Sequence, residues 1–141
     1  MGVEMSRLGV GFTQSITVKV TDQMVHQFAD LSGDRNPIHL NDEYASKTRF
    51  GRRIAHGMIA GALISRALVE CIGGGGVYLG QTLKFVNPVY IDDVITVTIK
   101  ITNVRKEKGI ATVETNVTKE NGDMVVKGEA VIMVGADMEH A

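Results

Sequence analysis

The stretch GMIAGALISRALVECI, from Gly57 to Ile72, decides the fold because it is apolar over most of its circumference when wound into an α-helix. Only Ser65, Arg66 and Glu70 interrupt this apolar surface, so we expect a helix that is buried rather than one that lies on a surface. Small residues recur along it, which allows another layer to approach its backbone closely. The four glycines Gly73–Gly76 then end the helix.

Strand patterns follow this helix. The predicted strands, which alternate apolar with polar residues or are rich in β-branched residues, cover residues 77–85, 94–101, 111–117 and 124–134. The sequence KEKG, Lys106 to Gly109, is expected to turn the chain between two of them. Asn121 and Gly122 lie between the last two, and both residue types tolerate the positive φ of a type I′ hairpin turn.

The segment before the helix predicts one strand and two short helices. Apolar and polar residues alternate from Phe12 to Val20, as in a strand with one buried face. Asp22 is expected to cap a short amphipathic helix that ends at Ser32-Gly33, and a second short helix is expected over Asp42–Ser46. The stretch LSGDRNPIHLN, Leu31 to Asn41, is therefore predicted as a loop between two helices.

These elements predict one α+β domain over residues 1–141, in which a curved antiparallel sheet of at least five strands wraps a long central helix. A chain of 141 residues buries roughly two-thirds of its unfolded surface, so it supports a core without covalent staples.

Composition narrows the class of function. The 15 Lys and Arg nearly balance the 16 Asp and Glu, so no broad field attracts nucleic acid or an anionic membrane. No stretch approaches the roughly 18 apolar residues of a membrane span. Cys71 is the only cysteine, which excludes an intramolecular disulfide and a cysteine-based zinc site. We therefore expect a cytoplasmic protein with neither metal nor cofactor.

A carboxylate and an imidazole, Asp34 and His39, stand five residues apart in a stretch too polar for a core. Hydration of a double bond conjugated to a carbonyl requires one group that accepts a proton from water and one that protonates the α-carbon, and this pair suffices. The alternative is a plain turn, because Gly33-Asp34 and Asn36-Pro37 are ordinary turn dipeptides. The two residues alone leave both interpretations open.

Gly57 begins the long helix, where its N–H is among the unpaired donors at the positive end of the helix dipole. This N–H could stabilise a thioester oxygen that gains negative charge, or the helix start could simply require a small residue. His56 beside it could contact a ligand or serve as a structural histidine.

Lys47, Arg49, Arg52 and Arg53 form a local basic cluster just before the helix. The cluster is either a solvated cationic loop or a surface for the phosphates of a nucleotide-tailed substrate. The glycines Gly73–Gly76 are interpreted as a turn, since they follow a helix and meet its negative end rather than the end that binds phosphate.

The sequence SGDRNPIHLNDEYA followed by FGRRIAHGM resembles the hydratase-2 signature of the MaoC-like, R-specific enoyl-CoA hydratases, which have the hot-dog fold. The order of elements from Phe12 to Val134 is similar to the whole family domain. The resemblance implies that Asp34 and His39 are the catalytic pair that holds the water, and that Gly57 supplies the N–H for the oxyanion.

The resemblance adds Ser65 and Asn36 to the ligand-binding candidates His56 and Arg52, which the local sequence suggested. Ser65 matches a serine that contacts the catalytic centre in some members, and Asn36 matches a position that shapes the loop. The predicted substrate-binding residues are Ser65, Asn36, His56 and Arg52. The family also implies a homodimer whose sites lie near the subunit interface.

The sequence thus predicts a lyase that hydrates trans-2-enoyl thioesters of CoA or an acyl carrier protein to (R)-3-hydroxyacyl thioesters, or catalyses the reverse dehydration. The hot-dog scaffold permits two alternatives, an acyl-CoA thioesterase and a non-catalytic acyl-binding subunit, because a fold does not determine a function.

Overall fold

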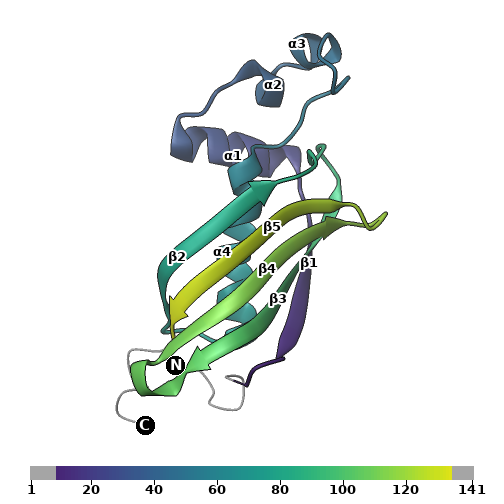
Figure 1. Cartoon of the computed structure of the whole chain (residues 1–141). Coiled ribbons are helices and arrows are strands. Elements are labelled where there is room, and N and C mark those ends of the chain that lie inside the picture. The colour runs from purple at the N-terminus through teal and green to yellow at the C-terminus, as the bar shows by residue number, and fades with distance from the viewer. Residues whose placement is uncertain (1–8, 135–141) are drawn as a thin grey trace.

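The computed structural model describes residues 9–134. Figure 1 shows a curved sheet, a long helix behind it, and three shorter helices gathered beyond one end of the sheet. The elements in chain order are β1 (Thr13–Lys19), α1 (Asp22–Ser32), α2 (Pro37–Leu40), α3 (Asp42–Ser46), α4 (Gly57–Ile72), β2 (Val77–Phe85), β3 (Val94–Arg105), the 3-10 turn η2 (Lys106–Lys108), β4 (Ile110–Lys119) and β5 (Met124–Met133).

The sheet has five strands in the order β1-β3-β4-β5-β2, and every neighbouring pair is antiparallel. The three strands β3, β4 and β5 follow one another in sequence and form the centre. β1 and β2 flank them, so the chain reaches one edge before the helices and the other edge directly after α4.

The core lies between α4 and the concave face of the sheet. A fully buried Val, Leu or Ile side chain contributes about 1.5–3 kcal/mol to stability. The helix contributes Ile59, Leu63, Ile64, Ala67, Leu68, Cys71 and Ile72, and the central strands contribute Ile95, Val97, Ile99, Ile101, Val113, Val117, Val126, Ala130 and Ile132.

One stripe of α4 is not covered. Met58 and Val69 are 52% and 56% exposed, and Ala62 and Ser65 between them are also exposed. Their spacing places these four residues on one face of the helix. The expected burial of the helix therefore holds for the side that faces the sheet but not for this stripe, because a single sheet covers only one side of a helix.

The segment that precedes α4 differs from expectation in two details. The cap of α1 is Thr21, whose side chain accepts the N–H of Met24 at 3.2 Å, and Asp22 lies in the first helical turn instead. The predicted loop contains the short helix α2, which is too brief to produce a periodic pattern. Gly33 ends α1 in the left-handed conformation (φ 77°), as predicted.

The hairpin between β4 and β5 also forms differently. Gly122 has a φ of 91°, but Asp92 is the only non-glycine residue with positive φ within residues 9–134, so Asn121 does not adopt the type I′ conformation. The N–H of Gly122 instead donates to the carbonyl of Lys119 at 2.9 Å. This is the pattern of a longer loop in which one glycine takes the left-handed position.

A curved antiparallel sheet around one long helix is the hot-dog fold, so the predicted α+β class is confirmed. Within residues 9–134, no helix has the length and apolar character needed to cross a membrane.

Candidate active site

Three side chains that could transfer protons or bind polar groups converge beyond one end of the sheet. Asp34 lies two residues after the end of α1, His39 lies on α2, and His56 is the N-cap residue of α4. One polar atom from each lies within 4.8 Å of the others. The folding of the segment between α1 and α4 therefore gathers two predicted catalytic residues and one predicted substrate-binding residue.

His39 is held in one tautomer. Its side chain is buried, with the residue 8% exposed, and its Nδ1–H donates to the carbonyl of Ile54 at 2.8 Å. A carbonyl only accepts, so the proton is on Nδ1 and the neutral ring presents Nε2 as an acceptor.

Burial lowers the pKa of His39 below its usual 6.5. The hydrogen bond to Ile54 opposes this shift, His56 adds a smaller lowering, and the charge of Asp34 adds a smaller rise. The net lowering of the pKa favours the neutral ring at neutral pH, which is the form that can accept a proton.

Asp34 is exposed and is held by three hydrogen bonds. Its Oδ1 accepts the N–H of Asn36 at 3.2 Å, and its own N–H donates to Ser32 Oγ at 3.0 Å. Its carbonyl accepts the Nε2–H of His56 at 2.9 Å. These bonds leave the second carboxylate oxygen available to a water or a substrate.

Two residues hold the short helix that carries His39. Asn36 Oδ1 accepts the N–H of Ile38 at 3.2 Å, so this side chain caps α2. Arg53 is only 14% exposed at its side chain and donates to the carbonyl of His39 at 3.2 Å. It also forms ion pairs with Asp22 and Asp42 at 2.9 and 2.8 Å. The sequence offered no signal for this role, because the three partners are distant in the chain.

Gly57 lines a cavity of about 300 Å³ that lies between the segment from α2 to the start of α4 and the end of the sheet. Its N–H has no acceptor among residues 9–134 and is one of the free donors at the start of α4. A Cβ at this position would lie 3.0 Å from a ring carbon of Phe85. Besides His39, His56, Gly57 and Phe85, the lining is mainly apolar, with Val20, Phe50, Ile54, Ala55, Ile59, Ala60, Val86, Pro88, Val89, Ile95 and Val125.

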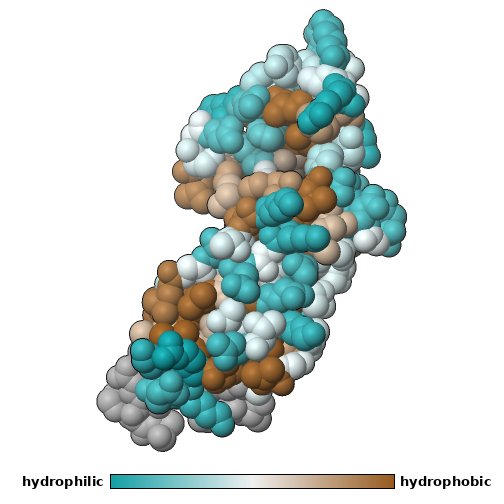
Figure 2. Space-filling model, in the orientation of Figure 1, coloured by the Kyte–Doolittle hydropathy of each residue, from teal (hydrophilic) through white to brown (hydrophobic). Residues whose placement is uncertain are grey.

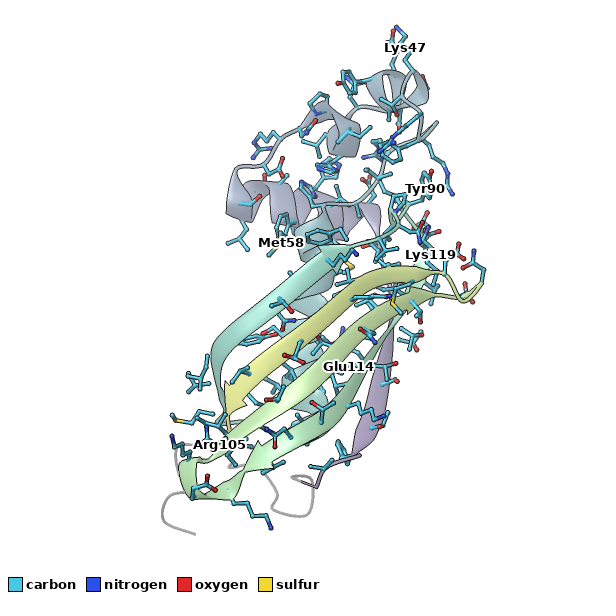
Figure 3. All side chains as sticks on the ribbon, in the orientation of Figure 1. Lys47, Met58, Tyr90, Arg105, Glu114 and Lys119 are labelled. Carbon is cyan, nitrogen blue, oxygen red and sulfur yellow. The ribbon has the colours of Figure 1, made fainter. Side chains whose placement is uncertain are left out.

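The other predicted substrate-binding residues lie apart from this cavity. Ser65 is two turns along α4 and lines a second cavity of about 80 Å³. The guanidinium of Arg52 lies 4.0 Å from the ring centre of Tyr90, outside the cavity lining. Figure 3 shows Tyr90 where the helical segment meets the sheet. Arg49, rather than Arg52, lines the cavity.

The distances among Asp34, His39 and His56 would allow a metal ion, but the two rings are arranged poorly for one. Their centroids are 3.9 Å apart and their planes differ by 30°. A nitrogen lone pair lies in its own ring plane, so stacked rings do not direct two lone pairs at one ion. The arrangement favours acid–base chemistry instead.

These features define a hot-dog protein with a carboxylate and an imidazole beside a helix N-terminus. Residues 5–122 match the family described as MaoC like domain, so the chain belongs to this family. It is 40% identical to the (R)-specific enoyl-CoA hydratase of Rhodospirillum rubrum over 127 residues, covering 89% of this chain and 88% of the relative.

Two further proteins, one named a dehydratase and one an R-hydratase, have the same level of identity to this chain. A 3-hydroxybutyryl-CoA dehydratase of Methylorubrum extorquens is 40% identical, with 90% of this chain and 81% of the relative covered. The solved structure of the R-hydratase PhaJ1 from Pseudomonas aeruginosa superposes with a TM-score of 0.90 and 40% identity, covering 95% of this chain and 86% of that one.

Proposed function

We propose that this protein adds water to trans-2-enoyl thioesters to form (R)-3-hydroxyacyl thioesters, and that it catalyses the reverse dehydration. The observation that carries the proposal is that the His39 imidazole and the start of α4 line one apolar cavity, while a carboxylate oxygen of Asp34 lies within 4.8 Å of ring nitrogens of His39 and His56. Relatives at about 40% identity named as hydratase and dehydratase support the same reaction.

The reaction needs only groups that this chain supplies. A water held between His39 Nε2 and the Asp34 carboxylate loses a proton to this pair while its oxygen bonds to the β-carbon. The electrons of the double bond move to the thioester oxygen, which the N–H of Gly57 stabilises. The pair then returns a proton to the α-carbon, so the net change is the addition of one water.

A test with crotonyl-CoA separates this reaction from the alternatives. Loss of the enoyl absorbance without release of free thiol is expected, and only an (R)-specific 3-hydroxyacyl-CoA dehydrogenase should oxidise the product. Release of thiol would identify a thioesterase, and an (S) product would contradict the proposed stereochemistry. A non-catalytic subunit would leave the substrate unchanged on CoA and on a carrier protein alike.

We further propose that Arg49 and Arg52 bind the phosphates of CoA. Within residues 9–134 neither has an acidic partner, whereas Lys47 pairs with Glu43 and Arg53 is committed to two aspartates. Arg49→Met should raise KM for crotonyl-CoA but not for crotonyl-N-acetylcysteamine, a thioester without phosphates. An equal rise in KM for both substrates would contradict this role.

A homodimer is the assembly we propose. Within residues 9–134, β2 pairs with β5 alone, so its other side is an edge of the sheet. Val77 and Leu79 on β2 are 51% and 49% exposed, and Figure 2 shows apolar residues gathered on this side of the sheet. Figure 3 shows Met58 of the exposed α4 stripe beside the carboxyl end of β2. A second copy would cover both surfaces.

Sedimentation of the wild-type protein and of Leu79→Lys tests this assembly. The wild type should sediment as a dimer, and the buried charge should convert the variant to a monomer. A monomeric wild type would contradict the proposal.

The cytoplasm is the proposed location. Cys71 is the only cysteine and is buried on α4, which fits a reducing compartment. Fractionation of cells that produce the tagged protein tests this, and recovery from the medium would contradict it.

A further inference from the structure

His56 connects three residues of the proposed site, namely Asp34, His39 and Gly57. Its Nε2–H donates to the carbonyl of Asp34 at 2.9 Å, and its ring stacks on that of His39 with centroids 3.9 Å apart. It directly precedes Gly57 in the chain. The ring of Phe28 on α1 is a further neighbour, at 4.8 Å between centroids.

The hydrogen bond from His56 differs in kind from the other bonds that hold Asp34. Ser32 and Asn36 are each two residues from Asp34, so their bonds move together with the loop. The bond from His56 joins residues 22 apart and links the loop to the start of α4. Among the hydrogen bonds of residues 9–134, it is the one that fixes Asp34 relative to another part of the fold.

The ring of His56 has one usable donor. The residue is 3% exposed, and Nδ1 is buried without a hydrogen-bond partner among the described residues. A second N–H placed there would be buried without an acceptor, which is unfavourable. The ring is therefore built to hold neighbouring groups rather than to pass protons through both nitrogens.

We propose that His56 is a positioning residue that keeps the Asp34 carboxylate in register with the His39 ring and the N–H of Gly57. This inference rests on the hydratase function proposed above. The proposed reaction transfers protons at one part of a short substrate and stabilises charge at another. It therefore requires a fixed distance between the pair Asp34 and His39 and the N–H of Gly57. A displacement of about 1 Å can lower the rate about 10²-fold.

Two matched substitutions test this role. Gln places its amide nitrogen near the position of ring Nε2, whereas Asn places it near Nδ1. His56→Gln should therefore retain the bond to the Asp34 carbonyl, and His56→Asn should lose it. We expect kcat for crotonyl-CoA to fall about 10²-fold in His56→Asn with KM nearly unchanged, and His56→Gln to recover most of that loss. His26→Asn, an exposed histidine on α1, is the control.

A second measurement does not depend on activity. The N–H groups of Asn36, Ile38 and His39 form hydrogen bonds inside the loop, to Asp34 Oδ1, Asn36 Oδ1 and the Asn36 carbonyl. Their hydrogen exchange should be faster in His56→Asn than in His56→Gln, because the loop has lost its bond to α4. If the wild type hydrates no enoyl thioester, the proposed function is overturned. The difference in exchange should still be observed in that case, because it does not depend on turnover.

Equal activity and equal exchange in folded His56→Gln and His56→Asn would overturn the inference. If both His56 variants unfold, Ser32→Ala tests the inference instead. Ser32 is exposed, and its bond to the Asp34 N–H joins residues of the same loop. The inference expects Ser32→Ala to change kcat by about threefold or less, or under about 0.7 kcal/mol. A loss of about 10²-fold would show that local contacts, not His56, position Asp34.

Discussion

The two ends of α4 each adjoin a cavity, but their chemistry differs. At the N-terminal end, Gly57, His39 and His56 line a cavity of about 300 Å³. At the C-terminal end, a cavity of about 80 Å³ is lined by Ser65, Gly73 and mostly apolar residues. A helix presents free N–H donors at its start and free carbonyls at its end, so only the first cavity can bind an oxygen that gains negative charge. The proposed site therefore depends on the direction of the helix more than on its apolar surface.

The largest effect should come from Asp34→Asn at the N-terminal end. The amide oxygen can still accept the N–H of Asn36, so the turn should fold, but an amide cannot take a proton from water. Turnover of crotonyl-CoA should fall about 10²–10⁴-fold, as expected for loss of a general base. Asp30→Asn, an exposed carboxylate paired with Arg35, is the matched control. Hydration near the wild-type rate would show that the stretch is a plain turn.

Gly57→Val should have the next largest effect. A Cβ would already lie 3.0–3.4 Å from the ring of Phe85, and the branched side chain adds bulk where the thioester must approach the N–H. We expect turnover to fall about 10²-fold. Adding Phe85→Leu should relieve the packing conflict but not restore the rate. Full recovery in the double variant would mean that the packing of Phe85, and not access to the N–H, limits activity.

Ser65→Ala should have a small effect if the comparison between the two ends is correct. Ser65 lies two turns from Gly57 and lines the smaller cavity. We expect kcat for crotonyl-CoA to change by about threefold or less, equivalent to under about 0.7 kcal/mol. A large loss in kcat would assign the C-terminal end a direct part in the reaction, as the family resemblance implied for this serine.

The smallest effect concerns stability in acid. Burial lowers the pKa of His39 in the folded protein, whereas the unfolded chain titrates near pH 6.5. Around and below that pH the unfolded state binds more protons, so stability should decrease as the pH falls through about 6.5 towards the lower pKa of the folded state. His39→Gln should make urea unfolding less dependent on pH over this range. The same slope in both proteins would show that His39 is not the group responsible.

Much of the fold was predictable because its signals are local. The alternation in β3 and the apolar run of α4 are both visible in short windows of sequence. The helix α2 was missed because it has only four residues, and the hairpin at Gly122 was misassigned because Asn-Gly fits more than one loop. The exposed stripe on α4 was missed since periodicity does not reveal how many layers cover a helix.

Some features of the candidate site were likewise predictable from the sequence, and others depend on the tertiary structure. The sequence by itself determined which residues can exchange protons, Asp34 and His39, and where a helix N-terminus follows them. Only the tertiary structure decided that the Ile54 carbonyl selects the tautomer of His39 and that Phe85 forms a wall of the cavity. The physical reason is distance along the chain. Motifs and periodicity describe neighbouring residues, whereas burial, tautomer and cavity shape depend on groups brought together from separate elements.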